Sequence, residues 1–214
     1  SGTAIINVSV DDGNGGIDSE TFSLTVNPIV DSPTLVVPAE IYLDEDTPID
    51  IVFTSSLTDL DGSEELTFNF TGLPDCAALG STTGDGSNWS ITLTPCNHSN
   101  EDFVLGITAT STEVSTGESL SFSDNINIVI NAIPDLPILE VSDGETVEDN
   151  TINILFTSML VDTDGSEYLT FSFDGLPEGT IVGEILNLSF NNYSFSLTPP
   201  LNSDIDFDFN ILAT

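Results

Sequence analysis

The sequence predicts an all-β protein built from tandem seven-stranded β-sandwiches in an extended array. Apolar residues alternate with polar ones along most of the chain, and a pattern of blocks recurs with a period of about 104 residues. No long stretch shows the 3.6-residue apolar period of an amphipathic helix, and Gly or Pro recurs every 8–12 residues or so, as in all-β proteins. The repeat therefore predicts domains, and the alternation predicts strands inside them.

The repeat is clearest in two long blocks. Residues 44–74 read DEDTPIDIVFTSSLTDLDGSEELTFNFTGLP, and residues 147–177 read VEDNTINILFTSMLVDTDGSEYLTFSFDGLP. The blocks NWSITLTP and NYSFSLTP, and the linkers VDSP and PDLP, align in the same order. We predict three segments: the last two strands of a preceding repeat, a first complete sandwich, and a second sandwich that lacks its last strand, over residues 1–29, 30–133 and 134–214.

Within the first complete repeat, alternation places the strands. Leu66, Phe68 and Phe70, for example, share one face of a predicted strand. The predicted strands cover residues 34–43, 48–57, 65–71, 76–81, 88–94, 102–112 and 119–131. Successive connections of antiparallel strands fall at opposite ends, so loops 58–64, 82–87 and 113–118 are expected at one end and loops 44–47, 72–75 and 95–101 at the other.

The charge balance excludes several partners. The chain has 36 Asp and Glu residues, no Lys or Arg, and a formal net charge of −36. Nucleic acids and anionic membrane surfaces attract Lys and Arg, so neither is an expected partner, and no apolar run is long enough for membrane insertion. The chain also offers trypsin no cleavage site. Mutual repulsion of the carboxylates must be relieved by salt, by bound cations or by spacing the charges apart.

Carboxylates gather in the loops predicted at the ends of the repeats. Carboxylate oxygens on flexible loops suit Ca²⁺ better than Mg²⁺, so Ca²⁺ is the expected cofactor. The predicted ligands are Asp31, Asp59, Asp61 and Glu64 at the start of the first repeat, and Glu45, Asp46, Asp102, Asp135, Asp162, Asp164 and Glu167 at the junction of the two repeats. The alternative is that the DxDGSE motif is a solvated turn, with Asp and Gly chosen for the backbone.

These motifs carry a family resemblance. The linker Asp, the DxD about 28 residues later and the acidic stretch before the second strand resemble cadherin-type junction sites. The blocks GNGGIDSETFSLTVNPIVDSPT and DTDGSEYLTFSFDGLPEGT look like the tandem cadherin-like and immunoglobulin-like repeats of very large bacterial surface adhesins. The resemblance implies an extracellular, cell-surface rod whose repeats are partners of one another and whose junctions are stiffened by calcium.

The cysteines and the glycosylation sequons bear on whether the protein is secreted. Cys76 and Cys96 lie in one repeat and have no counterpart in the other, which has Gly179 and Pro200 there, so we predict a local disulfide and a secreted protein. His98 is expected to be an ordinary surface residue. Glycosylation sequons occur at Asn7, Asn69, Asn88, Asn97, Asn187 and Asn192, which are either acceptors or merely outward-facing polar residues.

The sequence features favour a structural role over catalysis or glycan binding. A structural or adhesive spacer explains the repeats and the junction carboxylates, whereas no nucleophile–base arrangement suggests an enzyme such as a glycoside hydrolase. A glycan-binding module would need exposed aromatic residues, for which Tyr42 and Tyr168 are the candidates. An open sheet edge would also allow like chains to assemble into a filament by strand donation. The expected function is the spacer, and the expected chain is not an enzyme.

Overall fold

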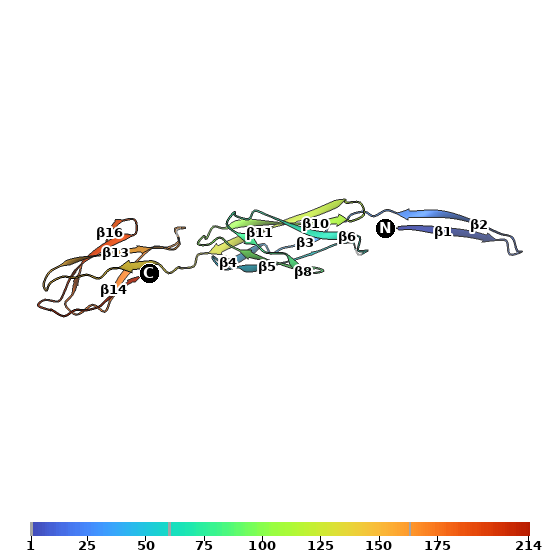
Figure 1. The fold of residues 1–214 in the computed structure, drawn as a ribbon. Coiled ribbons are helices and arrows are strands. Elements are labelled where there is room, and N and C mark those ends of the chain that lie inside the picture. Colours follow the sequence, from blue (N-terminus) through green and yellow to red (C-terminus); the bar gives the residue numbers. More distant parts are fainter. Residues whose placement is uncertain (1, 60, 163) are drawn as a thin grey trace. The chain divides into compact units, whose positions relative to one another are not determined.

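The computed structural model describes residues 2–59, 61–162 and 164–214. Throughout this part of the chain the regular structure consists of β-strands, so the predicted all-β class is confirmed (Figure 1). No helix capable of crossing a membrane occurs among the described residues. The chain forms two compact units: unit 1 comprises Ser1–Leu43, Thr47–Cys96 and Glu101–Val129, and unit 2 comprises Asp44–Asp46, Asn97–Asn100 and Ile130–Thr214.

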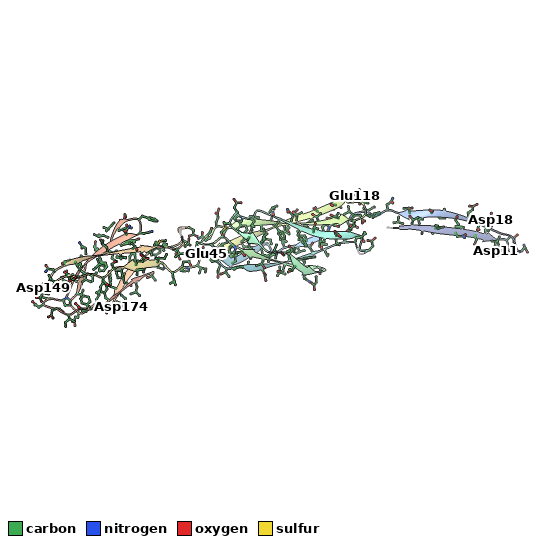
Figure 2. All side chains as sticks on the ribbon, in the orientation of Figure 1. Asp11, Asp18, Glu45, Glu118, Asp149 and Asp174 are labelled. Carbon is green, nitrogen blue, oxygen red and sulfur yellow. A yellow bond between two sulfur atoms is a disulfide. The ribbon has the colours of Figure 1, made fainter. Side chains whose placement is uncertain are left out.

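Unit 1 begins with a two-stranded hairpin. β1 (Gly2–Asp11) pairs antiparallel with β2 (Ile17–Val26), and the backbone N–H of Asp12 donates to the carbonyl of Gly16 at 3.0 Å to close the turn. Asp11 and Asp18 flank this turn (Figure 2). Period-2 alternation places the apolar side chains on one face, yet these side chains are exposed to solvent.

The rest of unit 1 is a sandwich of two antiparallel sheets. One sheet has the order β3-β5-β9-β7, with β8 also paired to β9, and the other has the order β4-β11-β10-β6. The first sheet contains β3 (Thr34–Val36), β5 (Ile49–Ser56), β9 (Asn88–Thr94), β7 (Ala78–Leu79) and β8 (Thr83–Asp85). The second contains β4 (Glu40–Asp44), β11 (Ser119–Asn131), β10 (Phe103–Glu113) and β6 (Glu64–Thr71).

Most predicted strands of the first repeat occur within a residue or two of their expected bounds, but two differ. The segment 34–43 is divided between β3 in one sheet and β4 in the other. Pro38 lies between them, and because proline lacks the N–H that a ladder needs, the chain leaves the first sheet there. The segment 76–81 forms only the two-residue β7, and β8 is an additional short strand. In its described residues the repeat therefore forms nine strands rather than seven.

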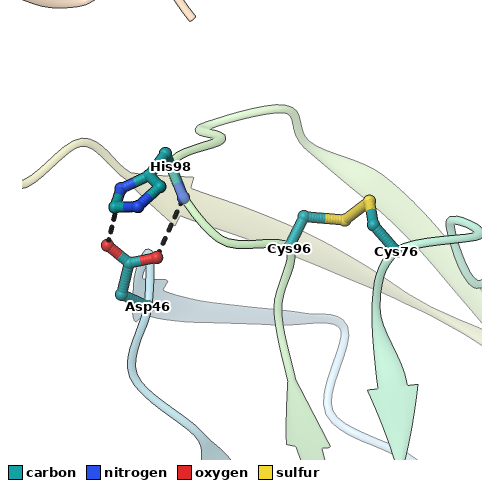
Figure 3. Close-up of a disulfide and its surroundings, with 4 residues drawn as sticks. All are labelled: Asp46, Cys76, Cys96 and His98. Carbon is teal, nitrogen blue, oxygen red and sulfur yellow. Dashed lines mark hydrogen bonds and ion pairs between the residues drawn. A yellow bond between two sulfur atoms is a disulfide. The ribbon is translucent and has the colours of Figure 1, made fainter. Parts of the chain in front are cut away.

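The core of unit 1 lies between its two sheets. The Phe68 ring meets the Phe53 and Trp89 rings edge-on, with centroids 5.1 and 4.8 Å away, and Trp89 Nε1 donates to the Ser55 carbonyl at 2.9 Å. Trp89 is therefore an inward residue whose one polar atom is satisfied. Cys76 and Cys96 form a disulfide with their Cα atoms 5.1 Å apart (Figure 3).

Unit 2 repeats the plan in part. One sheet has the order β12-β13-β17-β15, with β16 also paired to β17, and the other consists of β14 and β18. Ile154, Phe156, Phe195 and Leu197 form its buried core. The first of these sheets contains β12 (Ile138–Val141), β13 (Ile152–Met159), β17 (Asn192–Thr198), β15 (Ile181–Val182) and β16 (Leu186–Ser189). The second contains β14 (Phe171–Asp174) and β18 (Asn210–Ala213).

Candidate metal site

The DxDGS motif folds the same way in both repeats. In unit 2 the backbone N–H of Asp164 donates to Asp162 Oδ1 at 2.8 Å, and that of Ser166 donates to Asp164 Oδ1 at 2.7 Å. In unit 1 the corresponding bonds join Asp61 to Asp59 at 2.9 Å and Ser63 to Asp61 at 2.8 Å. The motif is therefore a turn held by its own carboxylates, which also fixes where those carboxylates point.

In unit 2 this turn brings three carboxylates together. Glu45, Asp162 and Asp164, which we call the Glu45 cluster, place one carboxylate oxygen each within 4.8 Å of the others. Glu45 follows β4, where its N–H donates to the Asn131 carbonyl at 3.0 Å, and the two aspartates follow β13. Residues more than a hundred positions apart thus meet in one acidic cluster.

Glu45 is the unusual member of this cluster. Its side chain is 1% exposed, Oε1 accepts the N–H of Ile133 at 2.7 Å, and the buried Oε2 has no hydrogen-bond partner among the described residues. Burial, assisted by the nearby charges of Asp162 and Asp164, raises the pKa of Glu45. An ionised carboxylate in such a place is costly unless a proton or a cation compensates it.

The cluster fits a hard cation. Ca²⁺ lies 2.3–2.6 Å from its oxygen ligands, so two ligands of one ion are at most about 5 Å apart, which agrees with the 4.8 Å limit of the cluster. A carboxylate oxygen that accepts one hydrogen bond keeps a lone pair for a metal, so the turn bonds of Asp162 and Asp164 do not compete with coordination. The orphaned oxygen of Glu45 would gain the partner that it lacks.

A second cluster contains the chain's one histidine. His98 Nδ1 lies 2.7 Å from Asp135 Oδ2. It also lies 3.4 Å from Asp46 Oδ2, and the His98 backbone N–H donates to Asp46 Oδ1 at 2.9 Å (Figure 3). The hydrogen bond that the His98 ring donates to the Asp135 carboxylate is the main reason that the pKa of His98 is raised. The sequence analysis treated His98 as an ordinary surface residue. However, His98 is the only side chain of this sequence that can become a cation, and this could have indicated a contact with a carboxylate.

The third cluster, in unit 1, comprises Asp31, Asp59 and Glu64. Glu64 is 6% exposed, and both of its oxygens are bonded: Oε1 accepts the N–H of Asp31 and Oε2 accepts the hydroxyl of Ser111, each at 2.7 Å. The Asp59 carboxylate closes the DxDGS turn. The buried glutamate of this cluster therefore needs no further partner.

The remaining predicted ligands stand outside these clusters. Asp61 closes its turn and Asp102 is exposed, and neither belongs to a cluster that the described residues form. Glu167 Oε1 accepts the N–H of Asp135 at 2.6 Å, and its Oε2 is buried without a hydrogen-bond partner in the described part of the chain. Glu167 thus holds the linker backbone through Oε1, and its place among the metal ligands stays a prediction.

Other candidate residues lie at the surface. Tyr42 and Tyr168 are 61% and 79% exposed, and the Tyr42 hydroxyl donates to Glu40 at 2.7 Å. The sequon asparagines are exposed as well, at positions Asn7, Asn69, Asn88, Asn97, Asn187 and Asn192. Their exposure is compatible with either reading of the sequons, so glycosylation stays a prediction.

Comparisons with known proteins give no family. No protein-family model matches the sequence, and no curated protein matches it. Solved structures that align with it include an endo-fucoidan hydrolase from glycoside hydrolase family 107 (13% identity, TM-score 0.35, 99% of this chain and 33% of that chain), the titin domains Z1Z2 in complex with telethonin (13%, 0.37, 87% and 91%), and the Yersinia pseudotuberculosis adhesin InvE (14%, 0.33, 78% and 51%). This chain thus spans about a third of the hydrolase, and at such TM-scores none of these alignments assigns an activity or a partner.

Proposed function

We propose that this chain is a structural or adhesive spacer of an extracellular surface protein, and that calcium bound by the Glu45 cluster stiffens the connection between its two repeats. Glu45 belongs to the first repeat of the sequence, and Asp162 and Asp164 belong to the second. A cation held by all three would therefore tie the repeats together. The observation that carries the proposal is the buried, unpartnered Oε2 of Glu45 beside two further carboxylates.

The physical role of calcium would be electrostatic. The chain has no Lys or Arg to neutralise its carboxylates, so each buried carboxylate needs backbone and hydroxyl donors, a proton, or a metal ion. Calcium would supply two positive charges to Glu45, Asp162 and Asp164, and protein carbonyls and water would complete its coordination shell. Without calcium these residues repel one another, and the loops that carry them loosen.

The test is to measure shape and stability with and without calcium. Small-angle scattering of the 214-residue protein should give a stiffer particle in calcium than in chelator, and the melting temperature should rise with calcium concentration, as for any ligand that binds only the folded state. Magnesium at the same concentration is the control, because it demands a tighter octahedral shell. Identical scattering curves and melting temperatures in calcium and in chelator would remove the proposal.

A further inference from the structure

The β16–β17 hairpin of unit 2 differs from its counterpart, the β8–β9 hairpin of unit 1, in the side chains that it exposes. The two hairpins match in the repeat, because the Ser158 N–H donates to the Asn191 carbonyl as the Ser55 N–H donates to the Ser87 carbonyl, at 3.0 Å in each case. This match places large apolar side chains of unit 2 where unit 1 has small or polar ones: Leu186, Leu188 and Phe190 against Thr82, Gly84 and Gly86. The three apolar side chains are 55%, 55% and 88% exposed.

The turn of the unit 2 hairpin is built to present Phe190. In unit 1 the first turn residue is Gly86 with φ of 66°, a conformation that large side chains rarely adopt. In unit 2 the positive φ, 63°, falls on the next residue, Asn191, so the first position carries Phe190 without that strain. The Asn192 amide nitrogen donates to Ser189 Oγ at 3.1 Å and to the Phe190 carbonyl at 2.8 Å. Hydrogen bonds therefore hold the turn that exposes the ring.

A further leucine extends this apolar surface across the sheet. Leu155 of β13 and Leu186 of β16 are both paired with Ser194 of β17, one on either side of it. Directly paired residues of neighbouring strands share one face of a sheet, here the face opposite to that of the core residue Phe195. Leu155 is 63% exposed, whereas Ser194 between the two leucines is only 8% exposed. We call the exposed apolar side chains of this region the Leu186 patch: Leu155, Leu186, Leu188 and Phe190.

The Leu186 patch lies on a surface without charge. Its side chains come from residues 150–161 and 185–203, which contain no Asp or Glu, and the second segment is the longest such run in the chain. Among the described strands of this sheet only β12, at the opposite edge, carries a carboxylate, that of Glu140. The matching sheet of unit 1 has the exposed carboxylate of Asp50 where unit 2 has Asn153. Unit 2 therefore combines exposed apolar side chains with an absence of charge on one face.

This combination indicates which partner the patch fits. A partner rich in Lys and Arg would be drawn to the carboxylates, which lie elsewhere on the chain. In a two-fold contact between copies, the same surface faces itself, so each carboxylate within it would meet like charges. For a chain with 36 carboxylates and no Lys or Arg, such a contact costs least where carboxylates are absent. Large exposed apolar patches are also typical of surfaces that bind another protein.

We propose that the Leu186 patch is the contact between two copies of this chain, which pair through unit 2 with one sheet facing the other. The contact removes the four apolar side chains of the patch from water and brings no carboxylate of β13, β16 or β17 against its copy. Unit 1 does not pair in this way, because its matching hairpin has glycines and a threonine instead. The contact does not involve calcium, so it stands or falls separately from the spacer function.

Self-association in chelator is the first test. Sedimentation velocity of the 214-residue protein without calcium should show dimers that grow with protein concentration, and added salt should favour them because it screens the repulsion between the two chains. Leu155→Asp should weaken the dimer about tenfold or more, because it buries a charge in the contact. Val52→Asp changes the matching exposed residue of unit 1 and should leave dimerisation nearly unchanged. A wild type that stays monomeric in chelator at every concentration, or equal effects of the two variants, would overturn the proposal.

A thiol on the same face locates the contact. Thr157 of β13 lies two residues from Leu155 on the outer face of the sheet, and Thr54 is its exposed counterpart in unit 1. Both native cysteines are in the disulfide, so Thr157→Cys and Thr54→Cys each add one reactive thiol. Alkylation of Thr157→Cys should slow several-fold as the protein concentration rises, whereas that of Thr54→Cys should not. Rates that change equally, or not at all, would place the contact elsewhere and contradict the proposal.

Discussion

Unit 1 and unit 2 both bury a glutamate beside aspartates, but they satisfy it differently. In unit 1 the two oxygens of Glu64 accept one hydrogen bond each, from Asp31 and Ser111, and nothing is left unpaired. In unit 2 only Oε1 of Glu45 has a partner, and Oε2 is buried without one in the described residues. The difference shows two ways of burying a carboxylate in a chain without Lys or Arg: a full set of donors, or a place prepared for a cation.

The largest expected effect concerns the disulfide, which only unit 1 has. Removing it with Cys76→Ser/Cys96→Ser should lower the free energy of unfolding of unit 1 by about 3 kcal/mol, because the bond closes a loop between residues 20 positions apart. Denaturant unfolding of the oxidised protein and of the double variant would measure this. A loss below about 1 kcal/mol would mean that the bond does not restrain the unfolded chain as the loop-entropy argument assumes.

The matched positions of unit 2 sharpen this test. An ideal Cβ on Gly179 would lie 3.6 Å from Cβ of Pro200, within the range of a disulfide, but Gly179 has φ of 91°. A cysteine there would carry the strain of a left-handed backbone, on the order of 1–3 kcal/mol. Gly179→Cys/Pro200→Cys should therefore stabilise unit 2 by clearly less than the native bond stabilises unit 1. An equal gain, measured in the same unfolding experiment, would refute this account of why unit 2 has no disulfide.

The two buried glutamates should respond with opposite signs to the same substitution. In chelator at neutral pH, Glu64→Gln should cost about 1 kcal/mol of unfolding free energy, because charge-assisted bonds from Asp31 and Ser111 become neutral ones. Glu45→Gln should instead stabilise the protein, since it removes a buried charge beside Asp162 and Asp164 while an amide oxygen can still accept the N–H of Ile133.

The pH dependence of the second variant follows from the raised pKa of Glu45. Above that pKa the wild-type side chain is ionised and Glu45→Gln is the more stable protein; as the pH falls through it, the wild type takes up a proton and the advantage disappears. Urea unfolding midpoints of the wild type and of Glu45→Gln, measured above and below the pKa of Glu45, would test which of the two proteins is the more stable. Destabilisation by Glu45→Gln at neutral pH in chelator would contradict the description of Glu45 as an uncompensated carboxylate.

The smallest expected effect is at His98, whose counterpart in the second repeat is Asn202. Both residues have a positive φ, of 51° and 56°, and the Asn202 N–H donates to Asp149 as the His98 N–H donates to Asp46. His98→Asn should thus keep the loop and lose only the ion pairs of the ring with Asp135 and Asp46. Because the pKa of His98 is raised, the stability that these pairs add is fully present below the ordinary histidine pKa and is lost as the pH rises through the raised value.

Melting temperatures of wild type and His98→Asn measured across this pH range would test the prediction. The two proteins should differ modestly on the acid side and converge on the alkaline side, because an ion pair that is more than a third exposed is weak. A difference that persists unchanged above the raised pKa would mean that His98 acts through packing rather than through charge.

Sequence reasoning predicted the strands well because alternation reports burial directly, as with Ile107 in β10 and Ile128 in β11. It also chose the carboxylates of the Glu45 cluster, because the recurring DxDGS turn fixes where Asp162 and Asp164 point. It missed His98, since contact with Asp135 depends on two loops far apart in the sequence. It placed Glu167 among the ligands, which stays a prediction, but it did not foresee that this side chain also bonds to the linker N–H, a backbone contact that no residue pattern reveals.

Calcium titration calorimetry on wild type and on Glu45→Gln tests the central claim most directly. The wild type should bind calcium saturably with a dissociation constant of roughly 10⁻⁴–10⁻³ M, as extracellular modules do. Glu45→Gln and Asp162→Asn should abolish that binding, whereas Asp85→Asn, an exposed residue of β8, should preserve it. Absence of saturable binding in the wild type, or binding that survives Glu45→Gln unchanged, would contradict the account.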